Sequence, residues 1–261
     1  MISTIHPIPA FSDNYIWAAR EAGSSRVCVV DPGDAQAVIE YLEASELQLT
    51  DILITHHHPD HTGGIQELVS RYSCRVVGPS GSGIIGISEF VAEGERVEVF
   101  GQSFSVIEVP GHTLDHIAYY CEDDDQDAPI LYCGDTLFAA GCGRLFEGTP
   151  EMMHKSLGKL SSLPANTRVY CTHEYTMANL QFAIAADGNN AALLERINTE
   201  QEKREAQQPT LPSTIELERA TNPFLRCQDA ELQRNMQEKL GTATQNEVEV
   251  FAALRSWKDT F

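Results

Sequence analysis

Basic residues are scarce in this chain of 261 residues. Its 18 lysines and arginines stand against 38 acidic residues, which gives a net charge of -20 with histidine neutral. Nucleic acids and anionic membranes bind proteins through clustered Lys and Arg. The charge balance therefore argues against both as partners and leaves a small molecule as the expected ligand.

Cysteine pairs and long apolar runs are also missing. The seven cysteines are an odd number without a C-x-x-C pair, so we expect neither a disulfide framework nor a zinc ribbon. No apolar run reaches membrane-spanning length, and the N-terminus has no basic segment followed by an apolar one. We expect reduced thiols in a soluble, cytoplasmic protein. The length allows one large or two modest domains.

Histidines, in contrast, are concentrated in one short stretch, 55–64. It follows the apolar run 52–54 and precedes a helix-like segment, so its potential ligands lie on a loop between a buried strand and a helix. These ligands are His56, His58, Asp60 and His61. Neutral imidazoles and a carboxylate at this density fit best around a cation. We interpret the loop as a metal site; the alternatives are a surface histidine cluster and a one-metal site that uses part of the set.

Three more predicted strands end in candidate ligands. The segments 104–109, 130–133 and 168–171 are followed by His112, Asp135 and His173. Each of these residues alone is typical of a turn or a helix cap. Because the same arrangement recurs after four apolar strands, we expect one shared site.

The pattern of helices and strands changes along the chain. The first part alternates apolar strands with helices, which implies a sheet buried under helices. Short strands are predicted at 96–99, 104–109, 116–120 and 130–133, and helices at 150–163, 178–186, 191–207, 229–240 and 245–258. Prolines predict a loop at 209–223. Since strands stop before residue 176, we place a domain boundary between 174 and 175.

Two acidic features lie outside this ligand set. Asp31 follows the predicted strand 26–30, and it either orients a metal ligand or serves only as a turn residue. The acidic run 122–127 lacks the spacing and the glycine of an EF-hand. We interpret it as a solvated hairpin loop.

The chain resembles the metallo-β-lactamase-fold hydrolases, whose His-Xaa-His-Xaa-Asp-His signature matches residues 56–61. It is similar in more detail to the glyoxalase II family. The matching segments are Gly111-His112-Thr113, Gly134-Asp135-Thr136, Gly141-Cys142-Gly143-Arg144, Cys171-x-His173-Glu174-Tyr175, Asn222-Pro223-Phe224 and Arg255-x-x-Lys258. This resemblance covers nearly the whole chain. It implies an α/β fold, an αββα sandwich over residues 1–174 followed by a smaller all-α substrate-binding domain, 175–261.

The resemblance further implies two divalent metals, zinc first, with iron or manganese as alternatives. His56, His58 and His112 would hold one metal, Asp60, His61 and His173 the second, and Asp135 would bridge them. A hydroxide shared by the metals would attack the thioester of S-D-lactoylglutathione and release glutathione and D-lactate. Asp60 and Asp135 would be the catalytic carboxylates.

Glutathione contacts are implied for four residues outside the metal set, Arg144, Tyr175, Arg255 and Lys258. Basic residues clustered at the opening of the site would bind a peptide with two carboxylates. Some family members carry a tyrosine where this chain has Phe146, so that hydroxyl contact is lost or made otherwise. Without the resemblance, Arg255 and Lys258 are typical of an ordinary charged helix face. We expect a monomer.

Other functions fit part of the same set of residues. Persulfide dioxygenases share the fold and the first motif but use one iron, whereas this chain carries a full second-metal set and a long helical tail. A binding module on a decayed hydrolase fold would lack ligands. Cys142 has no histidine pairing that would make it a nucleophile, and His116 either orients a ligand or is structural.

Overall fold

The computed structural model describes residues 1–122, 128–241 and 246–261. The chain divides into two compact units. Unit 1 comprises Met1–Glu108 and Asp115–Gly134, and unit 2 comprises Val109–Leu114 and Asp135–Phe261. The division predicted between residues 174 and 175 stays a prediction. The predicted acidic loop falls almost wholly outside the described residues.

Unit 1 contains a six-stranded mixed sheet in the order β1-β2-β3-β4-β5-β6. Its strands are β1 (Ile2–Ala10), β2 (Asn14–Glu21), β3 (Arg26–Val30), β4 (Gln48–Leu53), β5 (Arg75–Pro79) and β6 (Glu89–Val91). The first three pair antiparallel, whereas β3 to β6 pair in parallel. Helix α1 (Ala35–Ala44) connects β3 to β4, and α3 (Ile65–Tyr72) connects β4 to β5.

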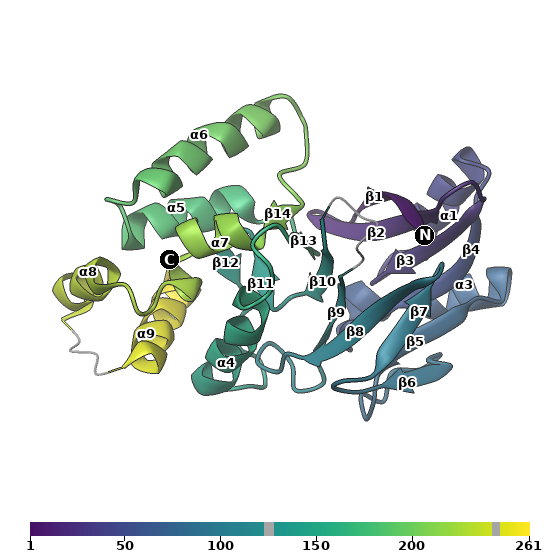
Figure 1. The fold of residues 1–261 in the computed structure, drawn as a ribbon, viewed down its shortest axis with the longest axis horizontal. Helices are drawn as coiled ribbons and strands as arrows, with labels where there is room; N and C mark the ends of the chain where they lie inside the picture. The colour runs from purple at the N-terminus through teal and green to yellow at the C-terminus, as the bar shows by residue number, and fades with distance from the viewer. Residues whose placement is uncertain (123–127, 242–245) are drawn as a thin grey trace. The chain divides into compact units, whose positions relative to one another are not determined.

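The two helices cover one face of this sheet (Figure 1). Val27 and Val29 of β3 pack in one core cluster with Leu42 of α1 and Leu68 of α3. Alternate strand residues face opposite sides of a sheet, so the intervening Cys28 belongs to the other face. The predicted sheet under helices is confirmed.

The second face of the sheet is covered by strands of the same unit. These are β7 (Arg96–Val99), β8 (Gln102–Glu108), β9 (Ile117–Cys121) and β10 (Ile130–Gly134), which pair antiparallel in sequence order. Tyr119 of β9 is fully buried and donates its hydroxyl to the Ile54 carbonyl at 2.9 Å. The four short strands predicted from the sequence are confirmed.

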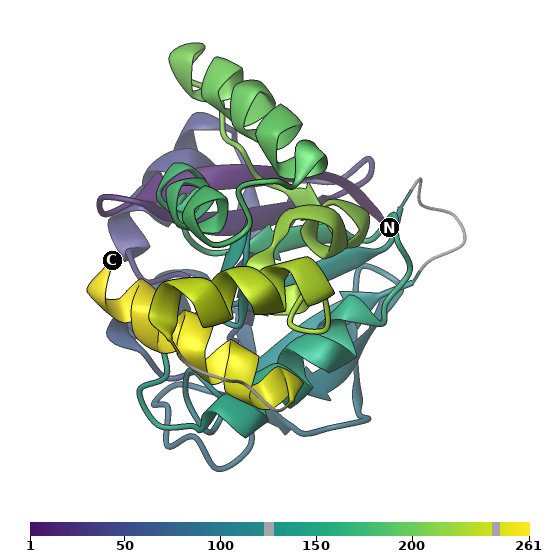
Figure 2. The ribbon, with the colours of Figure 1, turned by 90° about the vertical axis from the view of Figure 1, so that its left-hand side faces the viewer.

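Unit 2 is mainly helical. Its helices are α4 (Pro150–Ser161), α5 (Thr176–Ala186), α6 (Ala191–Glu205), α7 (Ile215–Thr221), the 3₁₀ turn η1 (Pro223–Leu225), α8 (Ala230–Leu240) and α9 (Glu247–Thr260). Its strands are the hairpin of β11 (Leu137–Phe138) and β12 (Gly141–Cys142), and the pair β13 (Arg168–Cys171) and β14 (Ser213–Thr214). Figure 2 shows α8 crossing α9, with which it packs.

The five predicted helices are confirmed, but the predicted loop at 209–223 is wrong in part. It contains β14 and α7, which begins where the Thr214 hydroxyl accepts a hydrogen bond from the Leu217 amide. A seven-residue helix is too short to show clear periodicity between prolines. Among the described residues, every helix is too short or too polar to span a lipid bilayer.

Candidate metal centre

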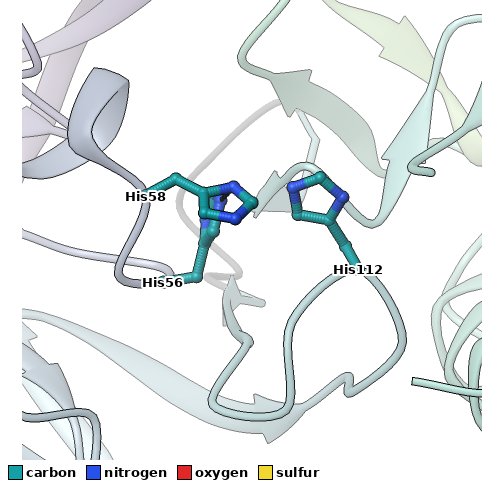
Figure 3. Close-up of side chains that lie close together, drawn as sticks. All are labelled: His56, His58 and His112. Carbon is teal, nitrogen blue, oxygen red and sulfur yellow. Dashed lines mark hydrogen bonds between the residues drawn. The ribbon is translucent and has the colours of Figure 1, made fainter. Parts of the chain in front are cut away.

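Residues His56 and His58 lie on the loop that follows β4, and their rings meet edge-on, at an interplanar angle of 72° (Figure 3). The His56 Nε2 and His58 Nδ1 atoms are 3.1 Å apart. On its other side, His56 Nδ1 contacts the Thr55 hydroxyl at 3.0 Å, and that hydroxyl donates to Asp31 at 2.8 Å. Since the hydroxyl proton is used on Asp31, the imidazole Nδ1 is the donor to Thr55. Nε2 therefore carries the lone pair that can bind a metal.

Asp31 is the buried residue that organises this loop. Its carboxylate accepts the Thr55 amide and hydroxyl, both at 2.8 Å, and contacts His61 Nδ1 at 3.0 Å. The backbone of Asp31 adopts a positive φ of 53°, which is unfavourable for a residue with a Cβ atom. The sequence left open whether Asp31 orients a candidate ligand or is only a turn residue. The contact with His61 supports the first alternative, because Asp31 binds Nδ1 of the ring and Nε2 points away from the Asp31 carboxylate.

The chain passes very close to itself around this loop. The amide of Gly64 donates to the Pro32 carbonyl at 2.9 Å, and a Cβ atom on Gly33 would lie 1.8 Å from the Asp60 carbonyl oxygen. Only glycine allows that approach. Asp60 is thereby held beside the Asp31 turn, where its carboxylate also accepts a hydrogen bond from the Asn14 side chain at 3.1 Å.

The two remaining histidines of this region have separate partners. His57 contacts the Asp115 carboxylate at 2.9 Å. His116 is buried and stacks on His56, with ring centroids 4.5 Å apart and an interplanar angle of 16°. His116 thus fixes the plane of the His56 ring by packing.

Unit 2 contains three buried candidate ligands on three separate segments. His112, also labelled in Figure 3, follows β8, Asp135 follows β10, and His173 follows β13. His112 Nδ1 donates to the Arg144 carbonyl at 2.8 Å. The Nε2 atoms of His112 and His173 lie 3.5 Å and 3.2 Å from Asp135 Oδ2.

These donor atoms have the spacing of metal ligands. Two ligands about 2.1 Å from a tetrahedral zinc ion are about 3.4 Å apart. Within unit 1, His61 Nε2 lies 3.4 Å from Asp60 Oδ2. His61 and His112 donate their Nδ1 protons to oxygen atoms. In a neutral ring, the Nε2 lone pair of His61 then faces the Asp60 carboxylate, and that of His112 faces the Asp135 carboxylate. A cation between them would convert that repulsion into two bonds.

The predicted substrate residues fall into two groups by burial. Arg144 is 57% exposed and its Nε lies 3.2 Å from Asp259, whereas Arg255 is 6% exposed. Arg255 donates to the Cys142 carbonyl and to Asp259, each at 3.0 Å. It is therefore not part of an exposed charged helix face. Asp259, which joins both arginines, had no signal in the sequence.

Lys258 and two aromatic residues complete this region of unit 2. Burial, together with Arg255 and Arg144, lowers the pKa of Lys258. Its ammonium group lies 5.5 Å from the ring centre of Phe182. Tyr175 stacks on His173 with centroids 4.6 Å apart, and the exposed Phe146 meets His112 edge-on at 5.2 Å.

Cys142 is unsuited to act as a nucleophile. Burial raises the pKa of its thiol to about 11, although Arg255 opposes that shift. The thiol is therefore protonated at neutral pH, and the thiolate is the reactive form. This agrees with the sequence, in which no histidine pairing marks Cys142 as a nucleophile, and the residue lies in β12.

The fold and these clusters of candidate ligands define a member of the metallo-β-lactamase superfamily, whose family model matches residues 14–173. A second model, the hydroxyacylglutathione hydrolase C-terminus, matches residues 174–261. The chain belongs to the hydroxyacylglutathione hydrolase family. The predicted fold class, a metallo-β-lactamase fold followed by a helical C-terminal region, is confirmed.

Relatives and solved structures support this assignment. Hydroxyacylglutathione hydrolase from Pseudomonas aeruginosa is 52% identical over 258 residues, 98% of this chain and 99% of the relative. The enzyme of the same name from Chromohalobacter salexigens is also 52% identical and covers 99% of both chains. The crystal structure of ETHE1 from Myxococcus xanthus has a TM-score of 0.66 at 23% identity, covers 99% of both chains, and shows the fold alone.

Proposed function

We propose that this protein hydrolyses S-(2-hydroxyacyl)glutathione thioesters. S-D-lactoylglutathione would be cleaved to glutathione and D-lactate, the second step of methylglyoxal detoxification. The observation that carries the proposal is the similarity to relatives named for this activity, which are 52% identical to this chain over nearly its whole length. The candidate ligands add to it, because all seven positions that the resemblance implies hold competent donors.

The metal ligands are assigned as two sets with one shared residue. We assign His56, His58 and His112 to one divalent metal, Asp60, His61 and His173 to the other, and Asp135 to both. Zinc suits this mixture of imidazole and carboxylate, with iron or manganese as alternatives. When bound, such a pair of cations lowers the pKa of a water molecule and polarises a carbonyl oxygen.

Other residues of the chain orient the candidate ligands and balance the charge of the proposed metals. The Asp31 carboxylate and the Arg144 carbonyl fix the Nδ1 protons of His61 and His112, which keeps each Nε2 available. The carboxylates of Asp60 and Asp135 supply negative charge that balances the cations. The leaving group is a thiolate whose conjugate acid has a pKa of about 8.5, so a dedicated general acid is not required.

Substrate recognition is assigned to the helical region 175–261 and the segment that ends in Arg144. The exposed Arg144 guanidinium, Lys258 and Tyr175 offer charge and an aromatic face for the carboxylates and backbone of glutathione. Arg255 is assigned to the same region, and its hydrogen bond to the Cys142 carbonyl supports the loop before Arg144. A cytoplasmic monomer is proposed, and the burial of all seven cysteines is compatible with reduced thiols in a reducing compartment.

The proposal is tested by incubating the purified protein with S-D-lactoylglutathione and following the loss of the thioester absorbance. The metal content is measured on the same sample. Rapid turnover with about two metals per chain is expected. A fully metallated sample without turnover would refute this substrate. Oxygen uptake with glutathione persulfide would then test for the one-iron dioxygenase reaction.

A further inference from the structure

The β11–β12 hairpin connects two parts of the proposed metal centre. Its first strand begins two residues after Asp135, and its second ends two residues before Arg144, whose carbonyl holds His112. The Gly143 amide closes the base of the hairpin by donating to Thr136 at 3.2 Å. A Cβ atom on Gly143 would lie 2.0 Å from the Asp135 carbonyl oxygen, so this contact requires glycine. Any movement of the hairpin therefore moves Asp135 and the acceptor that orients His112.

The tip of the hairpin has a conformation that needs support. Ala140 has a φ of 56°, in the left-handed region that residues with a Cβ atom avoid. Its methyl group is buried against Leu180, Ala183 and Leu193 of α5 and α6. The packing fixes the methyl group but provides no partner for the polar backbone atoms of the turn.

Side chains from α5, from α7 and from the residue that follows α7 bind those backbone atoms. The Ala140 amide donates to Glu218 at 2.8 Å, the Gly141 carbonyl accepts from Asn222 at 2.8 Å, and the Ala139 carbonyl accepts from Asn179 at 3.1 Å. Asn222 also donates to the Phe138 carbonyl at 3.2 Å. Glu218 and Asn222 are both fully buried. The turn is thus held by hydrogen bonds in a site shielded from water, where they are strongest.

Glu218 is itself fixed by an internal ion pair. The buried Arg196 guanidinium donates to Glu218 at 2.7 Å and to the Thr221 hydroxyl at 2.6 Å. The side-chain amide of Asn222 donates to the second carboxylate oxygen of Glu218 at 3.0 Å. These donors hold the buried Glu218 carboxylate in a single orientation.

We propose that Glu218 and Asn222 are positioning residues for the metal centre. They set the hairpin tip and, through its two strands, the positions of Asp135 and of the Arg144 carbonyl. This role rests on the proposed function of the site. It also gives a role to the Asn222-Pro223-Phe224 segment, to which the sequence assigned none.

A matched pair of substitutions tests this role. In Asn222→Ser, the serine hydroxyl still caps η1, as Asn222 does for the Phe224 amide, but it cannot reach the hairpin carbonyls. In Asn190→Ser, the same change leaves a cap for α6 and removes side-chain bonds to Asp187 and Ala220, neither of which is a residue of the hairpin. Both variants are compared with the wild type in melting temperature, kcat, KM and zinc affinity by chelator competition.

We expect Asn222→Ser to lower kcat about tenfold and to weaken zinc binding by a similar factor, with little change in KM. Asn190→Ser should lose comparable stability and keep both properties. Adding Ala140→Gly to Asn222→Ser should restore part of the kcat, because glycine adopts the left-handed turn without support.

Three results would overturn the proposal. They are equal losses of kcat and zinc affinity in both Asn→Ser variants, wild-type values of both in Asn222→Ser, and no recovery with Ala140→Gly. If the wild-type protein does not hydrolyse the thioester, the proposed function fails, while zinc affinity still tests the positioning role separately.

Discussion

The candidate ligands of the two units are held in different ways. In unit 1, His56, His58, Asp60 and His61 come from one six-residue segment, and a single buried residue, Asp31, contacts the preceding Thr55 and the last residue of the segment. In unit 2, the ligands are separated by tens of residues and depend on backbone acceptors and on helices far along the chain. A contiguous set of ligands needs one local support, whereas a dispersed set needs the packing of a whole unit.

The largest effect is expected when the dispersed set is broken at Asp135. Asp135→Asn should lower kcat on the order of a thousandfold and reduce the metal content toward one ion per chain, because the negative charge proposed to bridge the two metals is lost. Steady-state kinetics and elemental analysis measure both. Asp115→Asn is the control, since it removes a carboxylate paired with His57 outside the ligand set. Near-normal turnover of Asp135→Asn with one tightly held metal would exclude a two-metal mechanism.

The contiguous set is broken most directly at Asp31. Asp31→Asn keeps the size of the side chain but weakens its hold on the Thr55 amide and on His61, so metal affinity should fall about 10- to 100-fold. Metal titration of the apoprotein measures this effect. Asp34→Asn, which retains the N-cap of α1, should bind metal normally. Unchanged metal affinity in Asp31→Asn would show that the ligand loop does not need this support.

A smaller effect is expected for the proposed substrate residues. Lys258→Ala should raise KM for the glutathione thioester about tenfold with little change in kcat. Arg255→Ala should raise KM too and should also lower the free energy of unfolding by about 2–4 kcal/mol, because the Cys142 carbonyl and Asp259 lose a buried partner. Kinetics and urea unfolding separate the two roles. An unchanged KM in both variants would remove the pair from the substrate site.

The smallest effect concerns pH and stability. Burial raises the pKa of the Cys142 thiol to about 11, so the folded state keeps its proton at pH values where the unfolded chain loses it. The stabilisation is complete below about pH 9 and is lost as the pH rises toward 11, by roughly 2 kcal/mol for this thiol. Melting temperatures from pH 8 to 11 should decline less steeply in Cys142→Ser than in the wild type. Equal slopes would contradict this effect of burial.

Much of the fold follows from local features of the sequence. The strands that lead to the candidate ligands and the five longer helices could be predicted because periodicity over five or more residues reflects which side of an element is buried. The short α7 could not, since its formation depends on a capping threonine and on packing of the buried Ile215 and Glu218.

The sequence by itself determined the types of candidate ligand and their order along the chain, because the imidazoles and carboxylates follow predicted strands with the spacing of the family. Tertiary structure decided which partners orient them. Asp31 is 30 residues from His61, and Glu218 is 78 residues from Ala140. It also decided that Arg255 is buried whereas Arg144 is exposed. Hydrogen bonds between residues so far apart in the sequence depend on which segments the fold brings together, and local sequence patterns do not predict those contacts.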